Sequence, residues 1–276
     1  MKKNIIYAIL AIILVAMAYI GQLAYKEAID YEKHTTKLVS YQNAGQQAEL
    51  KFESFAKSLL GNLFDDKIKI NIDKVKAKQT LSLENSKRYT RYFIYLLTIV
   101  LLSFFIISLR AFTFFGAFLA IETLIFGLIT PILMVTIHKD IKYLGDIVLS
   151  FESKGVIGSI EKLWSSGDIV VALVILIFSV VVPVSKVLAL LFVSIFMKSP
   201  FAHNIVKFFK LIGKWSMVDV FVVAVFLVYL TANNGDVSRA EIEVGLYFFL
   251  SYVIVSMIVS LTADKMLREF KKENSE

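Results

Sequence analysis

The sequence predicts an all-α polytopic membrane protein with about six transmembrane helices. Of its 276 residues, 57% are hydrophobic and only 19% are charged, and the mean hydropathy is +0.70. Soluble domains of this size are about half apolar and roughly a quarter charged. The charged residues are also concentrated between long uncharged runs, and a bilayer core is crossed by roughly 20 apolar residues of helix. We therefore expect most of this chain to be embedded in a lipid bilayer.

The candidate spans are the apolar runs between charged residues. Three of them are interrupted by a single ionisable side chain: Glu122, Lys186 or Asp219. The six runs cover residues 4–25, 92–109, 111–137, 169–197, 215–238 and 244–263.

The first run defines an N-terminal anchor, residues 1–25. It follows two lysines and contains Ala16-Met17-Ala18, which resembles a signal-peptidase site. The apolar stretch continues well beyond that site, so we expect the anchor to remain uncleaved, although cleavage stays an alternative.

Charge asymmetry predicts the orientation of the spans. With the N-terminus inside, the cytoplasmic flanks hold eleven Lys and Arg residues and the short outer loops hold five. Positive residues in short flanks favour the cytoplasm. We therefore expect both termini in the cytoplasm, residues 26–90 outside, and residues 91–110 returning through the bilayer as the second transmembrane helix.

The outer segment, residues 26–90, admits two interpretations. It lacks proline and cysteine, and the apolar residues between Leu50 and Leu60 approximate a helical stripe. Ile68, Ile70 and Ile72 alternate with polar residues, which suits a short strand. The segment is either a small periplasmic subdomain or a helical extension of the flanking spans.

A second polar stretch, residues 201–214, places apolar side chains on one helical face and lysines on the other. It predicts an amphipathic helix on the cytoplasmic leaflet, or else an ordinary basic loop. Gly155, Gly158 and Gly167 delimit a short outer helix that is expected to end near Trp164. They form no phosphate loop, because no Gly-Lys-Ser/Thr follows.

Several function classes lack their signatures. The absence of cysteine excludes disulfides, thiolate metal sites and Cys nucleophiles. His34, His138 and His203 are too isolated to predict metal binding, and no Walker motif is present to use ATP. The net charge of +7 comes from lysines beside apolar segments, so it does not indicate nucleic-acid binding. No cofactor or metal is expected, and no catalytic constellation predicts an enzyme.

Ionisable residues inside spans are the candidate functional residues, because each costs about 2.5 to 3.5 kcal/mol to insert. Lys186 lies about 12 residues from Lys198, or roughly 18 Å of helix, which favours a cavity or a partner over snorkelling. Asp219 and Ser216 share a helix face. The alternatives are a buried structural pair for Lys186, an interfacial carboxylate for Asp219, and a locally paired or protonated carboxyl for Glu122.

Two prolines are expected to break helices beside these residues. Pro183 has no N–H for the carbonyl of Ser179, and Pro131 has none for that of Gly127, which permits kinks. Counting residues from the flanking charges places Glu122 and Lys186 at the same depth, facing each other. Ser256 is expected to be an ordinary small polar residue of the last span.

Two motifs resemble the paraquat-inducible protein A family, over roughly residue 121 to the C-terminus. The first runs from Gly155-Val156 through Leu163-Trp164 and Gly167-Asp168 to the Pro183-Val-Ser185-Lys186 string. The second is Gly213-Lys-Trp215-Ser216-Met217-Val-Asp219.

The resemblance implies a four-helix module within residues 111–276 of a multi-pass bacterial inner-membrane protein. It also implies membrane lipids as ligands and a periplasmic MCE-domain protein as partner. Because the chain has a single module, a homo-oligomer that completes the site is a further candidate. The chain departs from many family members in having one module, no cysteine zinc ribbons and two additional N-terminal spans.

Two functions are consistent with these features. The first is a subunit of an envelope lipid transport system, with protonation of the intramembrane carboxylates as a candidate driving force. The second is a non-transporting scaffold that anchors or stabilises a periplasmic tunnel or envelope complex. The two differ in whether Lys186 and Asp219 are needed for function or only for folding.

Overall fold

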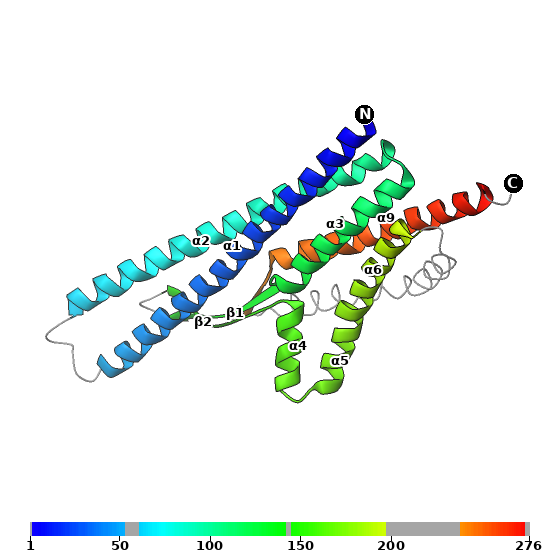
Figure 1. The fold of residues 1–276 in the computed structure, drawn as a ribbon. Coiled ribbons are helices and arrows are strands. Elements are labelled where there is room, and N and C mark those ends of the chain that lie inside the picture. The colour runs from blue at the N-terminus through cyan, green and yellow to red at the C-terminus, as the bar shows by residue number, and fades with distance from the viewer. Residues whose placement is uncertain (1, 53–60, 142–144, 197–237, 274–276) are drawn as a thin grey trace.

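The computed structural model describes residues 2–52, 61–141, 145–196 and 238–273. Five of its helices are long and apolar enough to cross a membrane, as an all-α polytopic protein requires. A three-stranded antiparallel sheet lies beside them (Figure 1). The predicted amphipathic helix 201–214 and the predicted span 215–238 lie outside the described residues, except for Ser238, which begins a strand.

The first two helices form a long antiparallel pair, α1 (Lys2–Phe52) and α2 (Gly61–Leu102). Their 51 and 42 residues correspond to about 76 Å and 63 Å of helix, twice the thickness of a bilayer core or more. Small and hydroxyl side chains are buried where the pair meets, which lets the two backbones approach closely. They are Ala24, Ala28 and Thr35 of α1 and Ser82, Ser86 and Thr90 of α2.

Residues 26–90 are thus largely helical extensions of the two spans, and we call residues 26–52 and 61–90 the arm. The strand predicted around Ile68–Ile72 was wrong, because α2 is helical throughout that stretch. From Gly61 to Leu102 the sequence contains no further glycine and no proline, so nothing interrupts the helix, and three alternating isoleucines do not override it.

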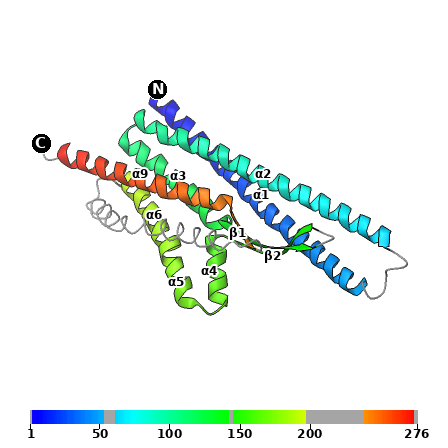
Figure 2. The same ribbon diagram turned by 180° about the vertical axis from the view of Figure 1, so that it is seen from behind.

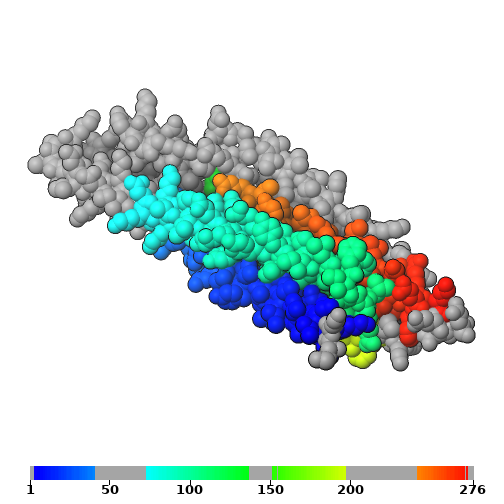
Figure 3. Space-filling model, turned by 90° about the horizontal axis from the view of Figure 1, so that it is seen from above, coloured from blue at the N-terminus to red at the C-terminus, as the bar shows by residue number. Residues whose placement is uncertain are grey.

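Two further helices pack antiparallel at close range, α3 (Leu109–Ile129) and α9 (Val244–Glu273). Two α3 glycines make this possible. A Cβ on Gly127 would lie 2.8 Å from the Cα of Phe249, and one on Gly116 would lie 2.5 Å from a methyl of Val259. Figure 3 shows the face on which α1, α2 and α9 lie side by side.

The predicted span 111–137 is too long, because α3 ends at Ile129. Thr130 is extended, with φ −82° and ψ 143°, as expected for the residue before a proline. Pro131 therefore ends the helix where a kink was predicted. The β-branched residues that follow, among them Val135 and Thr136, enter a strand and not a membrane helix.

The sheet has the order β2-β1-β3, with β1 (Leu133–Ile141) in the centre, β2 (Gly145–Lys154) on one side and β3 (Ser238–Ile242) on the other. Both pairings are antiparallel. The sheet lies beside the arm, with β2 packed against α1 (Figures 1 and 2). These strands were not predicted from the sequence.

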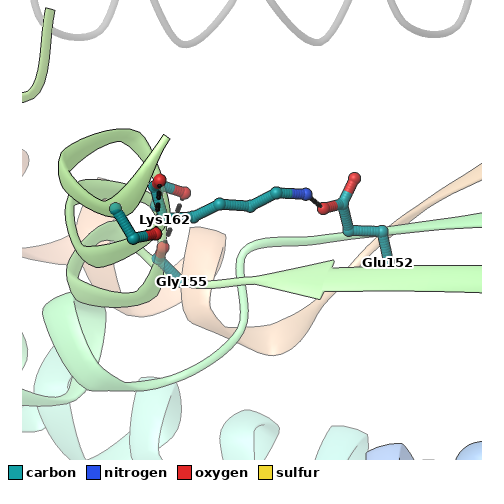
Figure 4. Close-up of polar contacts among 5 residues, drawn as sticks. Glu152, Gly155 and Lys162 are labelled. Atoms are coloured by element: carbon teal, nitrogen blue, oxygen red, sulfur yellow. Dashed lines mark hydrogen bonds and ion pairs between the residues drawn. The ribbon is translucent and has the colours of Figure 1, made fainter. Parts of the chain in front are cut away.

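After β2 the chain forms α4 (Val156–Ser165), α5 (Ile169–Leu176), a π-helical turn (Ile177–Val181) and α6 (Val182–Ile195). The short helix expected to end near Trp164 is confirmed. Gly167, with φ +88°, closes it, since its N–H bonds to the carbonyl of Trp164 and that of Asp168 bonds to Leu163. Lys162 reaches back from α4 to pair with Glu152 of β2 (Figure 4).

One end of the bundle is fixed by Arg110. Its guanidinium donates to the carbonyl oxygens of Ser194 and Ile195, both at 3.2 Å, so the start of α3 caps the end of α6. The contacts of α3 with α1 and α9 show that α1 begins, and α9 ends, at this same end. The sheet and the arm lie toward the opposite end (Figure 1).

Candidate functional site

Lys186 is buried within the apolar bundle, with 5% of its surface exposed. Its ammonium donates to the hydroxyl of Ser256 on α9, with Nζ and Oγ 3.2 Å apart. The same hydroxyl donates to the carbonyl of Val253 on its own helix. The hydroxyl of Ser256 is therefore a donor within α9 and an acceptor toward Lys186, so Lys186 is the donor in the contact between the two helices.

A second contact joins the same two helices one turn away. The hydroxyl of Tyr252 donates to the carbonyl of Pro183 at 3.4 Å. On each helix the two contacting residues are about one turn apart, with three residues from Pro183 to Lys186 and four from Tyr252 to Ser256. Because α6 and α9 therefore run in the same direction here, the two hydrogen bonds fix their rotation relative to each other.

The helix is distorted just before Pro183. The N–H of Val182 bonds to the carbonyl of Ile177, five residues back, which defines a π-helical turn. Such turns occur mostly as single insertions in α-helices, frequently at functional sites. The turn brings Pro183 and Lys186 onto the buried side of α6, whereas Ser185 is exposed.

No carboxylate in the described part of the chain forms an ion pair with Lys186. An ammonium has three N–H donors, and Ser256 accepts one. The other two N–H donors thus have no partner among the described residues. Asp219 and Ser216, expected to contribute to this site, lie outside the described residues, as do Gly213, Trp215 and Met217.

Glu122 does not form the predicted pair with Lys186. It lies on the face of α3 that carries Phe115 and Phe126, and these two rings contact Tyr7 and Gly21 of α1. Its Oε2 is buried and has no hydrogen-bond partner in the described part of the chain. Lys186 is directed instead toward α9, so the two residues serve different helix contacts.

Glu122 and Lys186 lie at nearly the same depth along the bundle, close to what the sequence predicted. The glycine contacts of α3 place Ser256, and hence Lys186, about one helical turn from the level of Glu122. What differs is the rotation of α3 about its axis, which counting residues could not supply. Sequence reasoning also missed Ser256 and Tyr252 as partners. The only available signal was their spacing of four on one helix face.

Metal binding has no support within the described ranges, where no three His, Asp or Glu side chains gather closely enough to hold an ion. The polar groups that the described residues bring together around Lys186 are an ammonium, two hydroxyls and a carbonyl. Such a set can bind an anionic headgroup, but it contains no activated nucleophile and base.

Comparison with known proteins places the resemblance in the second half of the chain. Residues 147–268 match the family model of paraquat-inducible protein A. The intermembrane transport protein PqiA of Escherichia coli (strain K12) is 29% identical over 137 residues, covering 48% of this chain and 32% of that protein. A probable intermembrane transport protein of Haemophilus influenzae is 28% identical over 108 residues, covering 37% and 26%.

The chain thus matches between a quarter and a third of the length of these curated relatives. No solved structure matches the chain. The apolar helices and the relatives together indicate a multi-pass protein of the bacterial inner membrane. The comparisons confirm the resemblance to the paraquat-inducible protein A family, carried by a region that includes Lys186, Ser256 and the helices that bring them together.

Proposed function

We propose that this chain is the inner-membrane component of an envelope lipid transport system, and that Lys186 binds the phosphate of a lipid headgroup. The observation that carries the proposal is an ammonium buried in an apolar bundle with two N–H donors unused among the described residues. An isolated charge there is costly, and a phosphate oxygen is a strong acceptor that neutralises it. The names of the relatives, intermembrane transport proteins, agree with such a role.

The proposal includes an orientation and a domain organisation. Both termini are cytoplasmic, residues 111–276 form the family module, and the arm extends into the periplasm. A periplasmic MCE-domain protein would then meet the arm and the sheet, which lie at the same end of the bundle. The asymmetry of Lys and Arg residues supports this orientation.

Proton coupling is the finer part of the proposal. The chain has no Walker motif, so the energy would come from a partner or from an ion gradient. Glu122 supports the second source, since its Oε2 is buried without a partner between α3 and α1. A carboxyl in that position can exchange a proton as the α1–α3 contact changes.

The test is affinity purification of the full chain from native membranes, followed by mass spectrometry of bound lipids and proteins. Lys186→Met should reduce co-purified phospholipid several-fold, because methionine keeps the volume but removes the charge. Lys162→Met, which removes an exposed lysine of α4, is the matched control and should not change the yield. Equal phospholipid yields from wild type and Lys186→Met would overturn the lipid site.

The arm favours a second candidate, a scaffold that holds a periplasmic complex without moving lipid. Its two helices extend about 40 Å past the anchor, and such a projection can serve as a binding surface for another protein. Lys186→Met and Glu122→Gln variants that accumulate normally and fully restore envelope integrity in cells lacking the protein would favour the scaffold. Loss of integrity at normal abundance would favour transport.

A further inference from the structure

Glu243 is the most deeply buried carboxylate among the described residues, with 1% of its surface exposed. It stands between β3 and α9, at the corner where the chain turns from the sheet into the last helix. Its Oε1 has no hydrogen-bond partner within the ranges that the structure describes. Nothing in the sequence motifs or in the proposed lipid site accounts for this residue.

The backbone holds Glu243 in place. Its N–H donates to the carbonyl of Ile132, and the N–H of Gly245 donates to that of Pro131. A Cβ on Gly245 would lie 2.4 Å from the carbonyl oxygens of Thr130 and Pro131, so the two segments are as close as backbones can be. Glu243 therefore cannot escape to solvent by a small backbone shift.

The charged groups around Glu243 come from three elements. Glu241 of β3 and Glu32 of α1 disfavour its ionised form, whereas Lys87 of α2 and the N–H of Val244 favour it. The hydroxyl of Tyr31 on α1 donates to Glu241 Oε2 at 3.2 Å. The arm thus contributes one hydrogen bond, one like charge and one opposite charge to this corner.

We infer that Glu243 is a proton-binding joint between the arm and the rest of the bundle. With the proton bound, the neutral carboxyl stays buried where α1, α2, β3 and α9 converge. When the proton leaves, a carboxylate without a full set of partners lies beside Glu241 and Glu32, and the arm and the sheet corner separate to let water reach it.

Two observations support a proton as the ligand. The carboxylates here are not gathered closely enough for a metal, since the described residues hold no three-ligand group. Burial, followed by the negative charge of Glu241, raises the pKa of Glu243 to about 7. A change of pH around neutrality therefore changes its protonation state. The inference holds whether or not the chain moves lipid, so its failure would leave the lipid site untouched.

The experiment measures the distance between the arm and the α4–α5 hairpin as a function of pH. The chain has no cysteine, so spin labels can be placed on Ala77→Cys and Ser166→Cys, two small exposed positions, in the full chain in lipid nanodiscs. Pulsed electron resonance at pH 5.5 and 8.5 should show a narrow distance distribution at the lower pH and a broader, longer one at the higher pH.

Glu243→Gln, which imitates the protonated form, should keep the narrow distribution at both pH values. Glu161→Gln removes an exposed carboxylate of α4 and should behave like the wild type. A wild-type distribution that does not change with pH, or a change that persists in Glu243→Gln, would overturn the inference.

Two charge variants test the joint without altering Glu243 itself. Removing the negative charge in Glu241→Gln should move the midpoint of the pH transition down, and removing the positive charge in Lys87→Gln should move it up, each by roughly a few tenths of a pH unit. Both side chains are exposed, and the amide oxygen of a glutamine at position 241 can still accept the hydroxyl of Tyr31. Midpoints that stay fixed, or that move in the same direction, would contradict the assignment to Glu243.

Discussion

Lys186 and Ser256, 70 residues apart in the chain, meet through one hydrogen bond of 3.2 Å between Nζ and Oγ. Since the hydroxyl of Ser256 is also bonded to Val253 of its own helix, it can accept from Lys186 in only one orientation. A serine of ordinary appearance therefore determines where a buried ammonium lies.

Ser256→Ala should lower the free energy of unfolding in mild detergent by about 1.5 to 3 kcal/mol, because a buried charged donor loses its acceptor. In a Lys186→Met background the same change should have a much smaller effect, which a double-mutant cycle measures. Thr262→Ala is the control, since that hydroxyl bonds only to the carbonyl of Ile258 on the same helix. Additive effects of Ser256→Ala and Lys186→Met would show that the two residues do not interact.

Gly245→Ala should impair accumulation of the folded protein or lower its melting temperature by several degrees. Its Cβ would collide with two backbone carbonyls at 2.4 Å, which cannot rotate away as a side chain could. Gly158→Ala, in the open helix α4 with nothing within 4 Å, should be neutral or stabilise by up to about 1 kcal/mol. The prediction fails if both variants melt alike.

Arg110→Ala should loosen the end of α6, because the carbonyl oxygens of Ser194 and Ile195 lose a charged donor. Hydrogen–deuterium exchange should rise in the last turn of α6 and remain unchanged in α9. Arg88→Ala, an exposed arginine over the ring of Tyr89, serves as control and should leave α6 protected. Unchanged exchange in α6 would mean that Arg110 is not its cap.

Thermal stability should fall as pH rises from about 4.5 to about 7 and then level off, owing to Glu243. Its pKa is raised from 4.5 to about 7 in the folded protein, mainly by burial, so the folded state keeps a proton that the unfolded state releases. The loss amounts to at most about 3 kcal/mol. Glu243→Gln should remove this part of the pH dependence, as differential scanning calorimetry in detergent can measure. A slope that the variant retains would assign it to other groups.

A cysteine introduced at Gln46, in the arm, should react with a membrane-impermeant maleimide in cells whose outer membrane alone has been permeabilised. The proposed orientation places this part of α1 in the periplasm. Asn4→Cys, at the opposite end of α1, is the matched control and should stay unlabelled in the same cells. Labelling at Gln46 only after the inner membrane is opened would reverse the topology.

Hydropathy predicted most of the helices because uncharged runs report directly on burial in lipid, and Lys186 was recognised as buried for the same reason. Hydropathy failed beyond Ile129, where it extended the span into what is strand β1. The apolar residues Leu133, Val135 and Ile137 raise the hydropathy in the same way whether they lie in a strand or in a membrane helix. Pro131 and the β-branched residues after it were the signal that the helix had ended. The partner of Glu122 was mispredicted because residue counting gives depth along a helix and not rotation about it.

The pairing of β1 with β3 could not be predicted, because β3 lies about a hundred residues after β1 in the chain. Such a pairing depends on how the helices bring distant segments together. Glu243 escaped notice for the same reason. In the sequence it is one of two carboxylates beside an apolar run, and only the fold encloses it.

The unbroken length of α1 makes it a lever. One continuous helix of 51 residues passes from the Tyr7–Phe115 contact inside the bundle, past Tyr31, to Phe52. Because a helix resists bending over this distance, a tilt of about 10° at the bundle would carry the end of an arm roughly 40 Å long sideways by about 7 Å. A change in the tilt of α1 within the bundle would thereby become a displacement at the far end of the arm, large enough to engage or release another protein.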